Sequence, residues 1–333
     1  MRILVAGGTG AVGRRLVPML VAAGHDVTGL GRSPGRLELL RATGARALAA
    51  DVLDASALRR VVADAAPDVV VHQLTDLSAA VPADNGRVRR EGTRNLVDAA
   101  LAAGVRRMLA QSISWAYAPG EGPAEEPVPL DVDAPGPRAS MVGSVAALEA
   151  AVAEVETHVV LRYGILYGPG TWYAPDGAVA AALAGRPDAP PFLGSLRPGP
   201  DVSSFLHVDD AARAAVAALE WPSGPVNVVD DEPAAGRDWL PVLSGALGVP
   251  APAPVDDAER TPWARGASNA LARARGWAPR WGSWREGFPA MTATPGAGDA
   301  GGAGGPGSAG GPGGAGGSIP AGGRERTAAE ARA

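Results

Sequence analysis

The 333-residue chain contains no cysteine and no lysine, so all 30 of its basic residues are arginine. Without cysteine, the protein has no disulfide bond, thiol nucleophile, zinc–thiolate site or iron–sulfur cluster. Without lysine, it has no lysine Schiff base, no Walker A phosphate loop and no proton relay through a lysine ammonium group. Four histidines and four tyrosines remain as candidates for acid–base chemistry near neutral pH.

Long apolar runs and blocks of like charge are absent as well. No run approaches the ~20 apolar residues that a membrane-spanning helix needs, and residues 1–5 lack the longer apolar stretch of a signal peptide. The net charge is -5, from 30 basic and 35 acidic residues, which argues against a nucleic-acid surface or a polybasic membrane patch. We therefore expect a soluble, cytoplasmic protein that binds neither nucleic acids nor membranes.

The composition changes sharply near Thr294. The last 40 residues hold 15 of the 46 glycines and, before Arg324, little besides glycine, alanine, proline and serine. Such a segment cannot bury enough apolar surface to offset the entropy lost on ordering. We predict a folded body over residues 1–293 and a disordered tail over 294–333.

Short apolar runs alternate with helical patterns over the first half of the body. The runs expected as strands are 3–6, 26–30, 45–49, 68–71, 108–111 and 159–161. The stretches expected as helices are 12–23, 34–42, 55–65, 87–103 and 140–155. This alternation predicts an α/β fold with a Rossmann-like, doubly wound parallel sheet. The alternation ends after Gly164, so we expect a main domain over 1–165 and a smaller C-terminal lobe over 166–293 that returns some segments to the main domain.

A glycine-rich segment follows the first expected strand and opens the first expected helix. Its sequence is Gly7-Gly8-Thr9-Gly10-Ala11-Val12-Gly13. The first, third and last of its glycines let the backbone turn tightly, approach a pyrophosphate and pack the helix on the strand, while the helix N-terminus offers amide groups to the phosphates. We predict that this segment binds a dinucleotide; a purely structural turn is the alternative.

The end of the second expected strand carries no carboxylate. An acidic residue about 20 positions beyond the glycines is typical of NAD sites, whereas an arginine accommodates the 2′-phosphate of NADP. The stretch here contains Arg32 and Ser33, which predicts an NADP(H) site with Arg32 as the phosphate clamp and Ser33 assisting. The alternative is NAD, with Arg32 a solvated arginine on a loop.

Two residues after the third expected strand, Asp51 and Val52, are expected to meet the adenine ring of the cofactor. The alternative for Asp51 is to cap the next helix. Asp54 suits that capping role better.

Several further segments, taken in order, resemble the extended short-chain dehydrogenase/reductase superfamily, in its NAD(P)-dependent epimerase/dehydratase group. Besides the glycine motif, they are residues 69–72, 91–97, 161–170, 205–210, 227–233 and 276–277. The resemblance implies a nicotinamide cofactor and a C-terminal lobe that binds a small-molecule substrate, often a nucleotide-sugar. It also implies a catalytic serine or threonine and a Tyr-x-x-x-Lys pair, in which the tyrosine exchanges a proton with the substrate and the lysine lowers the pKa of the tyrosine and holds the ribose.

The chain departs from this pattern at every catalytic position. Ile113 stands in the usual serine or threonine position, Met141 where tyrosine is expected and Val145 where lysine is expected. The whole chain lacks lysine, so no other alignment supplies one. The familiar proton relay is therefore absent.

The hydroxyl groups expected near the nicotinamide are those of Ser112, Ser114, Tyr117 and Tyr163. A serine is a poor acid unless water or a base assists it, and Tyr117 has a more suitable pKa. We therefore take Tyr117, Ser112 and Ser114 as the candidate catalytic residues.

Four aromatic residues, Trp115, Tyr117, Trp172 and Tyr173, lie on two segments expected to converge near the nicotinamide. They would form an apolar or sugar-stacking wall there, or they would pack the two lobes together. Trp263 and the later tryptophans are expected in the core of the smaller lobe.

One short segment resembles a metal site because it contains His207, Asp209 and Asp210, but no fourth ligand is evident. We expect the two aspartates to cap the helix 208–219, His207 to end a strand, and no metal to bind. A structural role is likewise expected for His72 at the end of the fourth strand.

Two functional hypotheses follow. In the first, the protein is an NADP(H)-dependent oxidoreductase or epimerase-like enzyme with a non-standard active site, acting on a small polar or sugar-like substrate. In the second, it is a catalytically silent NAD(P)-binding sensor or partner-binding module. The sequence leaves a homo-oligomer open.

Overall fold

The computed structural model describes residues 1–76, 82–187, 189–190, 193, 196–255 and 258–292. Residues Met1–Ala293 form one compact unit. The predicted disordered tail lies outside the described residues. In the described part of the chain, no helix is long and apolar enough to cross a membrane.

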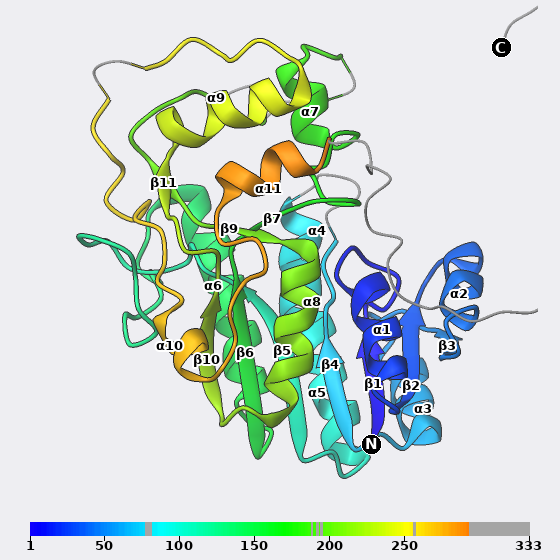
Figure 1. The fold of residues 1–333 in the computed structure, drawn as a ribbon. Coiled ribbons are helices and arrows are strands. Elements are labelled where there is room, and N and C mark those ends of the chain that lie inside the picture. The colour runs from blue at the N-terminus through cyan, green and yellow to red at the C-terminus, as the bar shows by residue number, and fades with distance from the viewer. Residues whose placement is uncertain (77–81, 188, 191–192, 194–195, 256–257, 293–333) are drawn as a thin grey trace, which may run out of the picture. The chain divides into compact units, whose positions relative to one another are not determined.

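A seven-stranded sheet lies at the centre of this unit (Figure 1). Its strands are β1 (Arg2–Ala6), β2 (Asp26–Gly31), β3 (Arg46–Ala49), β4 (Val69–His72), β5 (Arg107–Ile113), β6 (Thr157–Tyr163) and β10 (Gly224–Val228). They pair in the order β10-β6-β5-β4-β1-β2-β3, and every pair is parallel. The predicted Rossmann-like parallel sheet is thus confirmed. The sequence pattern did not identify β10, which joins the sheet from far along the chain.

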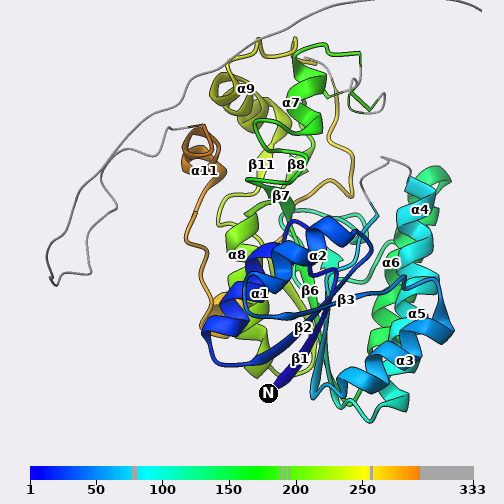
Figure 2. The same cartoon turned by 90° about the vertical axis from the view of Figure 1, so that its right-hand side faces the viewer.

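Helices cover both faces of the sheet (Figure 2). One face carries α1 (Gly13–Ala22), α2 (Pro34–Arg41) and α8 (Val208–Ala217), and the other carries α3 (Ala55–Ala65), α5 (Thr93–Ala102) and α6 (Gly136–Val152). Alternate strand residues face opposite layers, so Val5 packs with the first set of helices and Leu4 with the second. This double coverage explains why the strands are almost continuously apolar.

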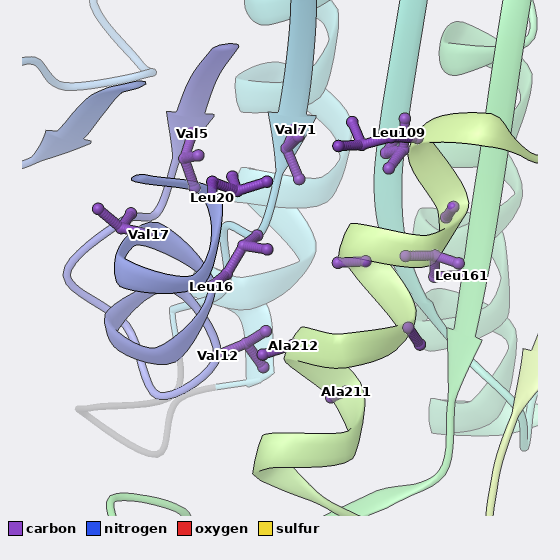
Figure 3. Close-up of a cluster of buried hydrophobic side chains, with 14 of the residues drawn as sticks. Val5, Val12, Leu16, Val17, Leu20, Val71, Leu109, Leu161, Ala211 and Ala212 are labelled. Carbon is purple, nitrogen blue, oxygen red and sulfur yellow. The ribbon is translucent and has the colours of Figure 1, made fainter. Parts of the chain in front are cut away.

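The layer between α1 and α8 is tightly packed (Figure 3). Leu16 and Leu20 of α1 point toward Val5 and Val71 of the sheet. On α8, the buried small residues include Ala211 and other alanines, which let that helix lie close to α1. Each fully buried leucine contributes roughly 1.5–3 kcal/mol relative to an exposed one.

The helix expected over 87–103 is interrupted. It consists of α4 (Pro82–Arg87), a π-helical turn η1 (Val88–Gly92) and then α5. At Gly92 a Cβ atom would lie 2.7 Å from the Cγ2 atom of Val52, so only glycine fits there without a shift of Val52. Isolated π-helical turns are rare and occur frequently at functional sites.

The smaller lobe lies beyond the carboxyl ends of the sheet strands (Figure 1). It contains two short sheets, with β7 (Ile165–Tyr167) parallel to β9 (Phe205–His207) and β8 (Val202–Ser203) antiparallel to β11 (Ala234–Ala235). Its helices α7 (Ala178–Leu183), α9 (Gly236–Leu247) and α11 (Trp284–Ala290) share one core cluster rich in aromatic residues. A further short helix, α10 (Ala270–Ala274), contacts β10.

The cap of α8 differs from the prediction. The helix begins after His207, whose Nδ1 atom accepts a hydrogen bond from the backbone N–H of Asp209 at 3.2 Å. The Asp209 carboxylate instead pairs with Arg15 of α1, and buried Asp210 accepts backbone N–H bonds from Arg280 at 2.9 Å and from the following residue. The expectation that the two aspartates cap this helix was therefore wrong, because both carboxylates bind elements distant in sequence. Both do lie in the first turn, as expected for acidic residues that stabilise the positive end of a helix. The expected strand end at His207 is confirmed.

A second buried carboxylate, Asp230, holds the start of α11. Its Oδ2 atom accepts the backbone N–H of Trp284 at 3.0 Å, and its Oδ1 atom has no hydrogen-bond partner in the described part of the chain. Burial raises the pKa of Asp230 to about 8. This carboxyl group therefore exchanges its proton near neutral pH in the folded protein.

Candidate active site

A cavity of about 1680 Å³ lies between the carboxyl edge of the large sheet and the smaller lobe. Residues that follow β1, β2 and β4 line one end, and residues from the end of β5, from α6 and from the smaller lobe line the other. In a doubly wound sheet, ligands bind at this edge. The cavity is therefore the place to look for both a cofactor and a substrate.

The glycine-rich segment forms a close-packed turn at the cavity. Gly7 has a φ of +88°, and a Cβ atom there would lie 2.5 Å from the carbonyl oxygen of Gln73. At Gly13 a Cβ atom would collide with the backbone of the preceding turn. Gly10 is different, because a Cβ atom there would meet one neighbour within 4 Å, the carbonyl oxygen of Gly7 at 3.2 Å, and Gly10 lines the cavity. The turn thus presents backbone without a side chain to the cavity at Gly10, where a phosphate would approach.

The surroundings of this turn suit phosphates. The first turn of α1 carries no acidic residue, and the positive end of its dipole lies at the cavity. Arg14 also lines the cavity, as do Thr9, Ala11 and Val12. A nicotinamide dinucleotide fits these residues: glycines where side chains would clash, a glycine at position 10 that lines the cavity, and positive charge nearby.

The residues expected around the adenosine half all line the cavity: Arg32, Ser33, Asp51 and Val52. Arg32 is mostly exposed and its guanidinium lies 3.2 Å from Oδ2 of Asp76. Asp51 accepts the backbone N–H of Leu53 at 2.9 Å. The cap of α3 is Asp54, whose Oδ1 atom accepts the N–H of Ala57 at 3.0 Å.

A buried ionic group lies behind the candidate serines. The Ser112 hydroxyl donates to Oε1 of Glu149 at 2.7 Å. The guanidinium of Arg162 donates to the same carboxylate from Nε at 3.0 Å and from Nη2 at 2.6 Å. Ser112 and Ser114 are both buried and both line the cavity. The carboxylate that Ser112 bonds is therefore shared with a guanidinium, which pairs with it through two hydrogen bonds.

The third catalytic candidate, Tyr117, lies apart from the two serines. It is buried, is not among the residues that line the cavity, and donates a hydrogen bond from its hydroxyl to Oδ1 of Asn227 at 2.6 Å. The Arg162 guanidinium lies over its ring, 4.8 Å from the centroid. Burial raises the pKa of Tyr117. The structure therefore brings Ser112 and Ser114 together at the cavity and leaves Tyr117 outside it.

Another tyrosine, Tyr163, does line the cavity. Its hydroxyl accepts a hydrogen bond from Nε2 of Gln73 at 3.3 Å and donates to the carbonyl oxygen of Ala211 at 3.2 Å. Burial raises its pKa well above the ordinary value, so it is a weak proton donor.

The two positions that would carry the tyrosine–lysine pair hold apolar side chains. Met141 lines the cavity, whereas Val145 is buried in a cluster with Ile113 and Ala116. Neither side chain exchanges a proton.

Aromatic residues form the far wall of the cavity. Trp115, Trp172 and Tyr173 line it, in agreement with the first of the two alternatives for these residues, and Tyr173 also packs edge-on against Trp239 at 6.1 Å between centroids. Trp263 lines the cavity too, with the Arg138 guanidinium 4.0 Å from its ring centroid. The expectation of a core position for Trp263 was therefore wrong, because the loop that carries it folds back toward the cavity.

One cavity residue that the sequence analysis missed is Arg89, in the π-helical turn η1. Nearby His72 is fully buried, with its Nε2 atom 2.8 Å from Oγ1 of Thr93, and burial lowers its pKa to about 4. His72 therefore has the expected structural role. In the sequence, Arg89 lies in a charged run with Arg87, Arg90 and Glu91, and nothing in that pattern distinguishes it from its exposed neighbours.

Metal binding finds no support in the described residues, where no group of three or more histidine, aspartate or glutamate side chains is placed to hold an ion.

Comparison with known proteins agrees with this geometry. The family model described as "NAD dependent epimerase/dehydratase family" matches residues 3–229. The chain belongs to this family. A Streptomyces protein named 3-diazoavenalumate denitrifying reductase is 46% identical over 311 residues, which cover 86% of this chain and 99% of that protein. The UDP-glucose 4-epimerase of Mycolicibacterium smegmatis is 29% identical over 285 residues, covering 75% of this chain and 84% of the relative.

Among solved structures, the UDP-glucose 4-epimerase of Thermus thermophilus in complex with NAD superimposes with a TM-score of 0.67 at 26% identity. The match covers 88% of this chain and 98% of that one. The family and the fold inferred from the sequence motifs are thus confirmed, and the chain is similar to both reductases and nucleotide-sugar epimerases.

Proposed function

We propose that this family member is an NADP(H)-dependent reductase whose substrate accepts a hydride without requiring a proton from the protein. The observation that carries the proposal is the apolar pair Met141 and Val145 where the family places its proton relay. The serine and tyrosine hydroxyls nearest this point are bonded to protein groups or weakly acidic.

Reduction of a carbonyl group does not suit such a site. Hydride addition to a carbonyl leaves an alkoxide, which must be protonated, and general acid assistance is typically worth ~10²–10⁴-fold in rate. A site without a general acid therefore lacks this rate enhancement for carbonyl reduction. The substrate class should therefore be one that creates no alkoxide.

A diazo-bearing carboxylate meets this requirement. The Streptomyces relative is named for removing nitrogen from 3-diazoavenalumate. When the diazonium carbon of such a compound accepts a hydride, a C–H bond forms and the C–N bond breaks, and the electron pair of the C–N bond leaves with dinitrogen. Atoms, charge and electrons balance with one hydride, and no proton is needed. We infer that this chain acts on the same chemical class.

Different residues along the cavity have different proposed roles. The glycine turn and Arg14 would hold the pyrophosphate, and Arg32 with Ser33 would hold the 2′-phosphate. A bound nicotinamide cofactor would supply the hydride. Met141 and the aromatic wall would exclude water from the reacting carbon and hold a planar substrate. The serines would orient the substrate rather than protonate it.

The proposal is tested by incubating the protein with NADPH and a ¹⁵N-labelled aromatic diazo acid, with NADPH deuterated at C4 in a parallel reaction. We expect one labelled dinitrogen per NADPH oxidised, and deuterium on the carbon that carried the diazo group. Gly10→Val protein, which should not bind the cofactor, measures the uncatalysed reaction. Tight NADPH binding without dinitrogen release would support the catalytically silent alternative, and efficient turnover of UDP-glucose would support an epimerase.

A further inference from the structure

The π-helical turn η1 directs an arginine without a partner into the cavity. Arg89 is partly buried, lines the cavity and makes no hydrogen bond or ion pair with any described residue. Its neighbours behave differently. Arg87 bonds Glu91 at 2.8 Å, and Arg94 bonds Glu154 at 2.6 Å, each on the protein surface.

The groups around Arg89 do not neutralise it. Burial lowers its pKa to about 10, which leaves it charged at neutral pH, and no nearby carboxylate among the described residues opposes this shift. His72, the buried titratable group that senses its charge, is neutral at this pH. The turn η1 packs against α6, whose cavity-lining side chains include Ser140, Met141 and Ser144. None of these carries a negative charge.

A charge that is partly withdrawn from water without a partner is destabilising, and buried charges are usually paired. In the protein without ligands, the guanidinium of Arg89 has no partner among the described residues, which lowers stability. This suggests that a bound anion pairs with Arg89 when the cavity is occupied. The groups proposed to bind the cofactor phosphates lie elsewhere in the cavity, at the glycine turn and at the end of β2. The helix α6, against which η1 packs, is the one on which the family resemblance places the tyrosine that exchanges a proton with the substrate.

We propose that Arg89 binds the carboxylate of the substrate and thereby selects planar aromatic acids over neutral compounds. This inference rests on the proposed function for the identity of the acid. The planar guanidinium matches a carboxylate with two parallel hydrogen bonds, a geometry that a lysine does not reproduce. Anchoring the acid at Arg89 fixes which end of the substrate lies toward Met141 and the nicotinamide side.

The test uses binding, so that it does not depend on turnover. Calorimetry with the NADPH-saturated protein measures the affinity for 4-hydroxycinnamate, an aromatic acid without a diazo group, and for its methyl ester. We expect Arg89→Gln to weaken binding of the acid by about 10- to 100-fold, as for loss of a charged hydrogen-bonded pair, and to leave the ester unchanged. Arg89→Lys should recover part of the loss.

The matched control is Arg90→Gln, because Arg90 is the exposed neighbour and does not line the cavity. It should bind both compounds as the unmodified protein does. Without added ligands, the Arg89→Gln protein should melt at the same or a higher temperature, since an unpaired buried charge is removed.

Equal weakening of acid and ester, equal weakening of NADPH, or no change in acid binding would each overturn the assignment. Loss of acid binding in Arg89→Gln, in a protein that releases no dinitrogen, would uphold the assignment and reject only the diazo chemistry.

Discussion

The two ends of the cavity differ in how closely they follow the family pattern. At the proposed cofactor end, the turn keeps the glycine spacing of the family, and at Gly7 and Gly13 one added carbon would strike the backbone. At the chemical end, Met141 and Val145 replace the two groups that move the proton. The difference teaches that the residues proposed for cofactor binding and the positions of the proton relay are separate, so a substitution at one end of the cavity need not alter the other.

The largest effect is expected at the cofactor end. Gly10→Val should weaken NADPH binding by more than about 100-fold while the sheet stays folded, because the side chain would occupy the part of the cavity beside the turn where we place the pyrophosphate. Fluorescence titration with NADPH and circular dichroism measure the two quantities. The control is Gly143→Ala on α6, where a Cβ atom meets nothing within 4 Å; it should bind NADPH normally. Undiminished affinity in Gly10→Val would place the cofactor elsewhere.

A buried carboxyl group of the smaller lobe should make stability depend on pH. Folded Asp230 keeps its proton up to about pH 8, whereas the unfolded chain loses it near about pH 4. The folded state therefore binds more protons between these values, and stability should fall as pH rises from about 4 to about 8. Asp230→Asn should remove this slope, worth several degrees in thermal midpoint. If the stability of the Asp230→Asn variant still falls as pH rises, other titratable groups cause the pH dependence.

Outside the cavity, Tyr117 should matter for stability more than for rate. Tyr117→Phe removes the 2.6 Å hydrogen bond to buried Asn227 and should cost about 1–3 kcal/mol of unfolding free energy, with kcat changed less than threefold. Denaturant titration and steady-state rates measure this. A large fall in kcat at unchanged stability would return Tyr117 to the catalytic group.

Cofactor preference gives a smaller effect. Arg32→Gln should weaken NADPH binding by about tenfold and leave NADH binding unchanged, because only NADPH carries the 2′-phosphate. Arg46→Gln, on the neighbouring strand and exposed, is the control for loss of one positive charge. Tighter binding of NADH than of NADPH by the unmodified protein would refute the preference.

The smallest effect is expected at the serines. If no proton donor is needed, Ser114→Ala and Ser112→Ala should each lower kcat for a diazo acid less than threefold, and Arg162 still pairs with Glu149 in the second variant. A fall in kcat of ~10²–10⁴-fold would identify the serine as a general acid. The chemical end of the cavity would then retain a proton donor, contrary to the comparison above.

Local pattern predicted the sheet and the cofactor turn well, because both depend on short-range signals. Apolar runs identified β1 to β6, and the spacing of Gly7, Gly10 and Gly13 located the turn. The remaining features depend on contacts distant in sequence. The edge strand β10 is defined by its pairing with β6. His207 caps α8 because the two aspartates of that helix bind partners distant in sequence. Arg89 reaches the cavity through a π-helical turn, which hydrophobic periodicity does not reveal.

The position of β10 has a consequence for how the chain folds. β6 is an unpaired sheet edge until residues 224–228 have been synthesised and have closed the long loop that separates them from β6. Such non-local pairing is slow, and an exposed strand edge is prone to pair with other chains. Truncation before Gly224 should therefore yield an aggregating fragment rather than an independent cofactor-binding domain.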